Sequence, residues 1–153
     1  METSVTDNYI ITTDRSLMRV DDIHHWLSNY SYWAKGIPPG VVRQAFDHSF
    51  VAGVLLNGRQ VGYARFVTDY AVFAYLADVY IEEAHRGRGL SKAMIRLMMD
   101  QPWIKDLRRL MLATVDAHGL YAGFGFTAVA KPERLMEIVQ AVPASYQPPM
   151  ISA

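Results

Sequence analysis

Residues 78–92 of the chain read DVYIEEAHRGRGLSK. An apolar strand, predicted from Val72 to Ile81, runs here into a turn that contains two glycines. A helix follows the second glycine, because apolar side chains recur with helical spacing from Leu90 to Met98. The strand is apolar on both faces, which is typical of a central strand covered on both sides. This order of strand, glycine turn and helix predicts the centre of an α/β fold.

The turn has the chemistry of an anion site. Free N–H groups and the dipole at a helix N-terminus favour negative charge. Gly87 and Gly89 let the backbone approach a phosphate closely, and Arg86, Arg88 and Lys92 add positive charge. The stretch lacks the third glycine of the dinucleotide fingerprint and the lysine pattern of the nucleotide P-loop. The alternative is a tight turn with solvated arginines.

The rest of the chain predicts a single domain, residues 1–153, with the element order β-α-α-β-β-β-α-β-α-β. The expected strands are Tyr9–Thr13, Phe50–Leu56, Gln60–Thr68, Val72–Ile81, Arg109–Val115 and Phe124–Ala130. The expected helices are Asp21–Tyr30, Pro39–Asp47, one from Leu90 to just before Pro102, Ala117–Ala122 and a further one at Glu133–Val139. Strands alternate with helices only in the second half, so we expect an α/β fold of the mixed α+β type. Its central mixed sheet has about six strands and is flanked by about four helices.

Charge and composition argue against several classes of protein. Fifteen Lys and Arg side chains balance fifteen Asp and Glu side chains, so no net positive field attracts nucleic acid. The absence of cysteine excludes disulfides, thiolate metal sites and cysteine nucleophiles, and no metal site is predicted. The longest apolar run, Ala71–Ile81, is too short to cross a membrane as a helix, and the N-terminus lacks a secretory signal pattern. A cytoplasmic protein is the default expectation.

Two stretches resemble the GCN5-related N-acetyltransferase (GNAT) family. Its pyrophosphate-binding motif, Arg/Gln-x-x-Gly-x-Gly/Ala, is similar to Arg86–Ser91, with serine in the last place. A second family motif, Ala-x-x-Leu-Tyr-x-x-x-Gly-Phe, is matched at every named position by AHGLYAGFGF at residues 117–126. An asparagine often stands three residues before that alanine, where this chain has Thr114. The resemblance covers Phe50–Val129, and the first fifty residues match only as a strand followed by two helices.

The resemblance implies a GNAT-like fold and an acetyl-CoA-dependent N-acetyltransferase. Such enzymes bind donor and acceptor together, and a primary amine attacks the thioester directly. By resemblance, Tyr121 is the general acid that protonates the leaving thiolate; the alternative is a packed aromatic beside Phe124 and Phe126. The cofactor-binding residues that the resemblance implies are Val79, Tyr80, Ile81, Arg86, Gly87, Arg88, Gly89, Leu90, Ser91, Thr114 and Tyr121.

The acceptor side is less defined. Asp78 is the only charge in an apolar strand, so a general-base role is one hypothesis, and pairing with an arginine is the commoner state of a buried carboxylate. By resemblance, the aromatic cluster of Tyr30, Tyr32 and Trp33 lines the acceptor, and ring faces suit an apolar or cationic amine. The alternative is that these rings cover the sheet edge or a dimer contact. The acceptor amine, on a small molecule or a protein, stays open.

Two further alternatives remain at this stage. The first is a non-catalytic module that binds coenzyme A or an acyl-CoA. The second concerns the apolar C-terminal segment, Met136–Ile151, which packs either on its own sheet or on a second copy of the chain in a homodimer.

Overall fold

The computed structural model describes residues 3–146. In that part of the chain one mixed sheet has six strands that follow each other in chain order. The strands are β1 (Thr3–Thr6), β2 (Tyr9–Thr12), β3 (Phe50–Leu56), β4 (Arg59–Thr68), β5 (Phe73–Ile81) and β6 (Arg109–Leu112). Neighbouring strands are antiparallel except β5 and β6, which are parallel. The predicted fold class, a mixed sheet of six strands with four helices, is confirmed.

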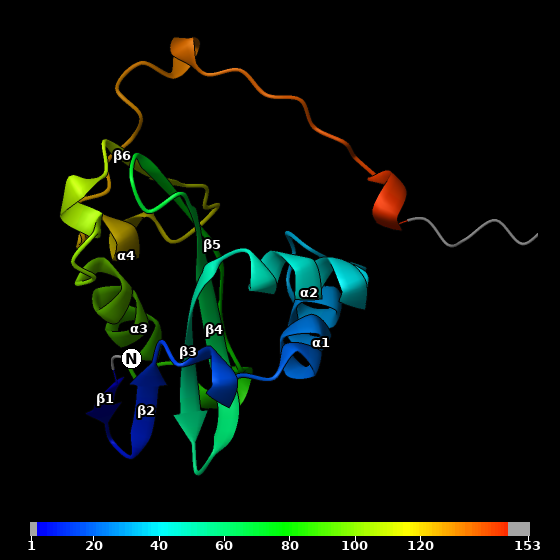
Figure 1. Cartoon of the computed structure of the whole chain (residues 1–153), viewed down its shortest axis with the longest axis vertical. Helices are drawn as coiled ribbons and strands as arrows, with labels where there is room; N and C mark the ends of the chain where they lie inside the picture. Colours follow the sequence, from blue (N-terminus) through cyan, green and yellow to red (C-terminus); the bar gives the residue numbers. More distant parts are fainter. Residues whose placement is uncertain (1–2, 147–153) are drawn as a thin grey trace, which may run out of the picture.

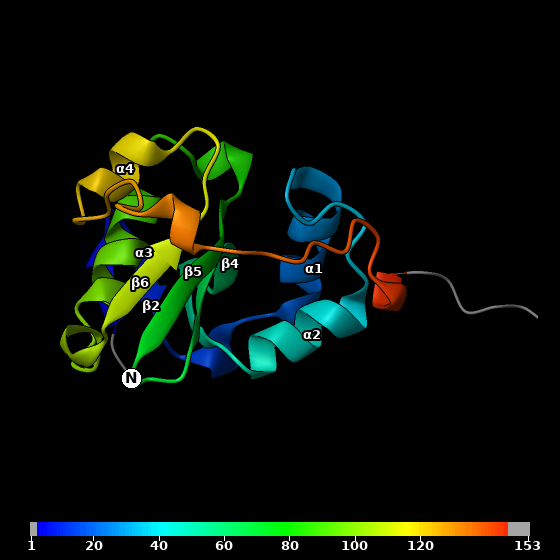
Figure 2. The same cartoon turned by 90° about the horizontal axis from the view of Figure 1, so that it is seen from above.

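Helices cover both faces of the sheet, as Figures 1 and 2 show. The α-helices are α1 (Val20–Tyr30), α2 (Pro39–Asp47), α3 (Leu90–Met99) and α4 (His118–Ala122). Helices α1 and α2 lie on one side, and α3 and α4 lie on the other. None of the helices within the described residues is long and apolar enough to cross a membrane.

Each face of the sheet has its own hydrophobic core. On one face the predicted stripe of α3, including the buried Met94 and Met98, packs with sheet residues such as Phe66. On the other face α1 and α2 bury Trp26 and Phe46, among others, against the sheet. Strand β5 supplies Ile81 to the first core and Tyr80 to the second. The strand is therefore central and covered on both sides, as its apolar sequence predicts.

The N-terminal hairpin is an element that the sequence reading missed. Strand β1 pairs with β2 through a turn in which Asp7 and Asn8 have φ values of 46° and 69°. Aspartate and asparagine tolerate this left-handed region, so the Asp-Asn pair is a turn signal of the same kind as Asn57-Gly58. The predicted hairpin at Asn57-Gly58 is present between β3 and β4.

The second half of the chain departs from the prediction in three places. Residues 124–130 form no strand, β6 ends at Leu112 instead of Val115, and the predicted helix at Glu133–Val139 is replaced by a short 3-10 turn at Pro132–Arg134. The side chains from Thr127 to Glu137 are exposed, so no buried apolar face reinforces the local preference of this segment. The local strand and helix patterns were therefore misleading here.

The C-terminal segment leaves the sheet and crosses toward α2 (Figure 2). Its large apolar side chains Met136, Ile138, Val139 and Val142 are exposed. Packing of Met136–Ile151 on its own sheet, one of the two alternatives, is therefore not found for residues 136–142. Residues 147–151 of that segment lie outside the described part of the chain.

Gly62 allows a close approach at the centre of the sheet. A Cβ atom at this position would lie 2.6 Å from Ile81 Cδ1 and 3.0 Å from Val54 Cγ2. We expect Gly62→Ala to lower the free energy of unfolding by about 1–3 kcal/mol, because both neighbours are packed in the core. Urea denaturation measures the change. Gly40→Ala is the control, since Gly40 lies in α2 with nothing within 4 Å of its added Cβ, and it should not destabilise the chain.

Candidate active site

Strands β5 and β6 separate and leave an opening in the sheet. They pair only from Phe73 to Leu76 of β5, so residues 77–81 have no strand partner on that side among the described residues. The Glu82 N–H donates to the carbonyl of Val61 on β4. Backbone direction alternates along a strand, so Val79 and Ile81 direct their backbone groups into the opening, and Tyr80 directs its own toward β4. Two of the three predicted backbone positions therefore face the opening.

A β-bulge at Asp78 accompanies the opening. The register between β4 and β5 shifts between Tyr63 and Arg65, and Asp78 has a φ of 57°. A bulge bends its strand and increases the local twist, which turns the end of β5 away from β6. Aspartate is one of the few non-glycine residues that adopts this backbone region without a large penalty.

The glycine turn at the end of β5 has the geometry of an anion cradle. Gly87 and Gly89 have φ values of 77° and 74°, and a Cβ added at either position meets no atom within 4 Å. Gly89 is the N-cap of α3, and no side chain caps the helix. The first helical hydrogen bond runs from Ala93 N–H to Gly89, so the preceding N–H groups of α3 have no partner among the described residues. Open space therefore faces free donors at a helix N-terminus.

The side chains of the turn divide into inward and outward groups. Leu90 is buried in the core, so only its backbone is available. Arg86 donates from Nε to the Ile81 carbonyl at 2.8 Å, and its guanidinium lies over the Tyr80 ring at 5.3 Å. Gly87, Arg88 and Gly89 are exposed, and Ser91 is half-buried. The structure thus brings the predicted phosphate residues together, with Arg86 also bracing the end of β5.

A polar network supports the turn from behind, and the sequence reading missed it. Glu82 lies 2.8 Å from Arg59 Nη2 and accepts a 3.2 Å hydrogen bond from Trp26 Nε1. His85 is 2.8 Å from the hydroxyl of Tyr9. These partners come from β2, β4 and α1, far apart in the sequence, so no local signal could have found them.

Tyr121 lies in the core, at the fifth position of the second motif. It is 9% exposed, and its ring packs edge-on against Phe126 at 6.2 Å. Burial raises the pKa of Tyr121, with smaller contributions from the nearby Tyr32 and Asp116. The phenol is therefore protonated at neutral pH and can donate a proton. The packed-aromatic alternative therefore describes the Tyr121 ring, and the side chain also lines the pocket of about 910 Å³ along β6.

Thr114 begins the turn into α4. Its hydroxyl accepts a 3.0 Å hydrogen bond from Ala117 N–H. Thr114 and Ala113 line two pockets, which therefore meet at this point of the chain. One pocket, of about 910 Å³, lies along β6 and the segment after α4 and includes Tyr121 and His118.

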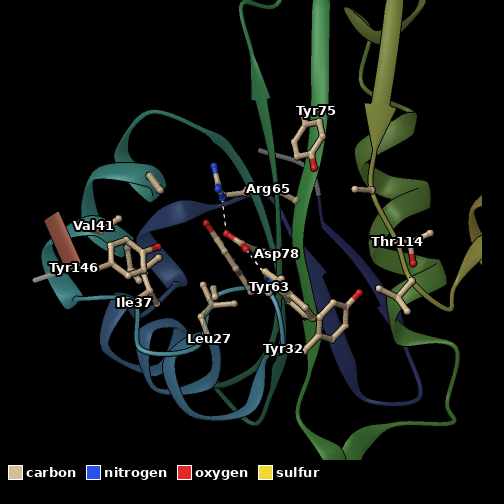
Figure 3. Close-up of a pocket in the computed structure, with 17 residues that line it drawn as sticks. Leu27, Tyr32, Ile37, Val41, Tyr63, Arg65, Tyr75, Asp78, Thr114 and Tyr146 are labelled. Carbon is tan, nitrogen blue, oxygen red and sulfur yellow. Dashed lines mark hydrogen bonds and ion pairs between the residues drawn. The ribbon is translucent and has the colours of Figure 1, made fainter. Parts of the chain in front are cut away.

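The other pocket, of about 470 Å³, lies on the α1 and α2 side of the opening (Figure 3). Its lining residues are Leu27, Tyr32, Trp33, Ala34, Ile37, Val41, Val42, Ala45, Tyr63, Arg65, Tyr75, Ala77, Asp78, Ala113, Thr114, Val115 and Tyr146. Of the predicted aromatic cluster, Tyr32 and Trp33 line the pocket. Tyr30 does not; it is exposed and packs edge-on against His25.

Asp78 lies in this pocket and is paired. Its Oδ2 is 2.6 Å from Arg65 Nε, and its Oδ1 accepts a 2.8 Å hydrogen bond from Trp33 Nε1. The side chains of Arg65 and Asp78 are 18% and 10% exposed. In the structure, Asp78 is therefore paired with an arginine, which is one of the two alternatives for this carboxylate. Within residues 3–146 no group of three or more His, Asp or Glu side chains could hold a metal ion.

Comparisons with known proteins agree with this architecture. The sequence profile of the Acetyltransferase (GNAT) family matches residues 20–126. A Gibberella zeae protein that is provisionally named an acetyltransferase is 33% identical over 135 residues, which cover 74% of this chain and 76% of that protein. The chain belongs to the GNAT family of acetyltransferases. The resemblance drawn from the two motifs is thereby confirmed.

Solved structures share the fold. A crystal structure from Xanthomonas campestris pv. campestris, provisionally assigned to the same family, is 47% identical and has a TM-score of 0.85, covering 89% of this chain and 96% of that one. A Clostridium acetobutylicum protein, assigned as an acetyltransferase by prediction and crystallised with acetyl-CoA, has a TM-score of 0.61 at 14% identity. It covers 86% of this chain, and 95% of its own length is matched. At that identity the second likeness concerns the fold alone.

Proposed function

We propose that this chain is an acetyl-CoA-dependent N-acetyltransferase that moves an acetyl group to a primary amine in a ternary complex. One observation carries the proposal. The uncapped N-terminus of α3, with two left-handed glycines before open space, follows a strand whose last residues, 77–81, lack a partner on the β6 side among the described residues. Tyr121 packs in the same core as Ile81 and Leu90. An anion cradle beside such an opening suits a substrate with a pyrophosphate and a long arm.

The residues present fit that substrate. Free N–H groups of α3 and the Arg88 side chain would hold the pyrophosphate, and no Cβ at Gly87 or Gly89 blocks its approach. The backbone groups of Val79 and Ile81 would align the arm along the free edge of β5. A backbone N–H at this edge would also stabilise the oxyanion that forms during attack.

The transfer then needs one new bond and one broken bond. The amine nitrogen, after losing a proton, bonds to the acetyl carbon, and the bond from that carbon to sulfur breaks. The leaving thiolate takes a proton from the Tyr121 hydroxyl. Tyr121 is suited to this role because its raised pKa keeps it protonated near neutral pH. Solvent in the pocket would return the amine's proton to Tyr121, which closes the cycle.

A non-catalytic module that binds coenzyme A or an acyl-CoA is the second candidate. Thr114, which stands where the family often has asparagine, favours it, because its hydroxyl is already bonded to Ala117 N–H. The two candidates differ in one measurable outcome, the release of free thiol from acetyl-CoA in the presence of an amine.

The first test is a calorimetric titration of acetyl-CoA into the native chain and into Gly89→Glu. We expect binding by the native chain and at least about a hundredfold weaker binding by the variant, because a carboxylate would occupy an anion site and a side chain would strain a φ of 74°. Gly58→Glu is the matched control: Gly58 has a φ of 78° and equally open space in the hairpin between β3 and β4, outside the glycine turn. It carries the same charge and the same strain, and it should bind acetyl-CoA normally.

Two outcomes would count against the proposal. Absence of acetyl-CoA binding by the native chain would contradict both the enzyme and the binding module. Equal weakening by Gly89→Glu and Gly58→Glu would show that backbone strain alone, and no anion site at α3, explains the loss.

A further inference from the structure

The pocket of about 470 Å³ has an unusual distribution of charge. Its walls are apolar or aromatic, and its lining contains one cation, Arg65, and one anion, Asp78. The two are paired, so the described lining has no net charge. An acceptor with several amines would need further carboxylates to replace its hydration. The pocket therefore disfavours polycations and suits a molecule whose own charges also cancel.

Arg65 keeps unused hydrogen-bond capacity. A guanidinium has five N–H donors, and Arg65 uses Nε toward Asp78 at 2.6 Å and Nη1 toward Ser49 Oγ at 3.1 Å. Its Nη2 donates to no atom of residues 3–146, and it is not among the buried atoms that lack a partner. This nitrogen is thus accessible. Figure 3 shows the guanidinium beside Asp78 among the lining residues. The N–H groups of Nη2 are therefore donors that an anionic oxygen of the acceptor could use.

Asp78 keeps acceptor capacity for an ammonium group. Each carboxylate oxygen has two acceptor sites, and Asp78 uses one oxygen for Arg65 and the other for Trp33. The bulge places Asp78 at the opening between β5 and β6, where an amine must lie to reach the thioester. An ammonium beside Asp78 and an anion on Arg65 would be adjacent, because the two side chains are in direct contact.

We infer that the acceptor is an α-amino acid with an apolar or aromatic side chain. This inference rests on the proposed acetyltransferase function and names its substrate class. The carboxylate binds Arg65 Nη2, and the amine lies beside Asp78 at the opening. The side chain contacts the apolar and aromatic walls that α1, α2 and the segment ending at Tyr146 supply. A cavity of this size is within the range of small-molecule sites.

The reaction balances with this acceptor. The ammonium loses one proton to solvent, its nitrogen bonds to the acetyl carbon, and the carbon–sulfur bond breaks with its electrons on sulfur. The nitrogen then loses a second proton, which replaces the one that the thiolate takes. The products are an N-acetyl amino acid, coenzyme A and one proton released to solvent. The carboxylate is unchanged, so it stays on Arg65 throughout.

The test compares acceptors that differ only in the carboxylate. Leucine, methionine and phenylalanine are each assayed beside their amides and their decarboxylated amines, by following free thiol released from acetyl-CoA. We expect kcat/KM to fall by at least about tenfold when the carboxylate is removed, since a charged hydrogen bond to arginine is lost. With Arg65→Gln this preference should shrink to about one, because the amide cannot pair with an anion. Arg65→Lys, which keeps the charge, should retain part of it.

The outcomes distinguish a failure of the proposed acetyltransferase function from a failure of the inference about the acceptor. Failure of the native chain to bind acetyl-CoA contradicts the proposed function itself. Binding of acetyl-CoA together with turnover of amines that lack a carboxylate, at rates equal to the amino acids, contradicts the inference alone. Binding of acetyl-CoA without turnover or calorimetric binding of any of the amino acids contradicts it as well. The native chain gives these results even if an Arg65 variant does not fold.

Discussion

Tyr121→Phe is expected to lower kcat by about a hundredfold or more and to leave acetyl-CoA affinity almost unchanged. The phenyl ring keeps the packing against Phe126, and only the hydroxyl that we propose protonates the leaving thiolate is lost. A steady-state assay of thiol release with a turned-over amine gives kcat, and calorimetry gives the affinity. A fall in both quantities together would instead indicate a structural role.

Tyr70→Phe is the matched control for this experiment. Tyr70 is 50% exposed and packs edge-on against Trp103, away from the opening. It loses the same hydroxyl without touching the proposed site, so kcat should stay at the native value. Native turnover by Tyr121→Phe would remove the general-acid role and would leave a water molecule or the acceptor itself as the proton source.

Arg65→Met is expected to lower the free energy of unfolding by about 3 kcal/mol, at the lower end for a broken buried ion pair because some solvent still reaches both side chains. The variant leaves the Asp78 carboxylate, 10% exposed, with the Trp33 hydrogen bond and no cation. Urea denaturation measures the change. Adding Asp78→Asn should recover most of the loss, because asparagine has no charge to pair and tolerates the same backbone region.

Arg59→Met is the comparison that shows how much burial adds to the contribution of an ion pair to stability. Arg59 also pairs with a carboxylate, Glu82, at 2.8 Å, but its side chain is 61% exposed. An exposed pair of this kind contributes about 0–1 kcal/mol. Equal effects of Arg59→Met and Arg65→Met would mean that the Arg65–Asp78 pair gains nothing from its position in the pocket.

The sequence predicts best the parts of the fold that local patterns determine. The period of apolar residues in α3 and the Asn57-Gly58 turn each depend on neighbours in the chain, and both are present in the structure. The segment after Phe124 shows the limit of local patterns. Its strand-like and helix-like stretches find no apolar surface to cover, so tertiary context outweighs propensity there.

The residues of the candidate site could likewise be predicted only where they lie in a continuous motif. The glycine turn and Tyr121 lie in continuous motifs, and the structure places the turn at the N-terminus of α3 and Tyr121 in α4, in the same core as Leu90. The partners of Asp78 could not be predicted, because Arg65 and Trp33 reach it from β4 and from the loop after α1. Similarly, the choice of Tyr32 and Trp33 over Tyr30 depends on where α1 ends, which spacing alone does not determine.

Tyr146 contributes one wall of the proposed acceptor pocket from a part of the chain that lies beyond the family profile. The family profile ends at residue 126, and Tyr146 belongs to a later segment that pairs with no strand among the described residues. Substitutions or length changes in that segment can accumulate without cost to the sheet. In the proposed site, a change in this segment would therefore reshape one wall of the pocket and leave the sheet unchanged.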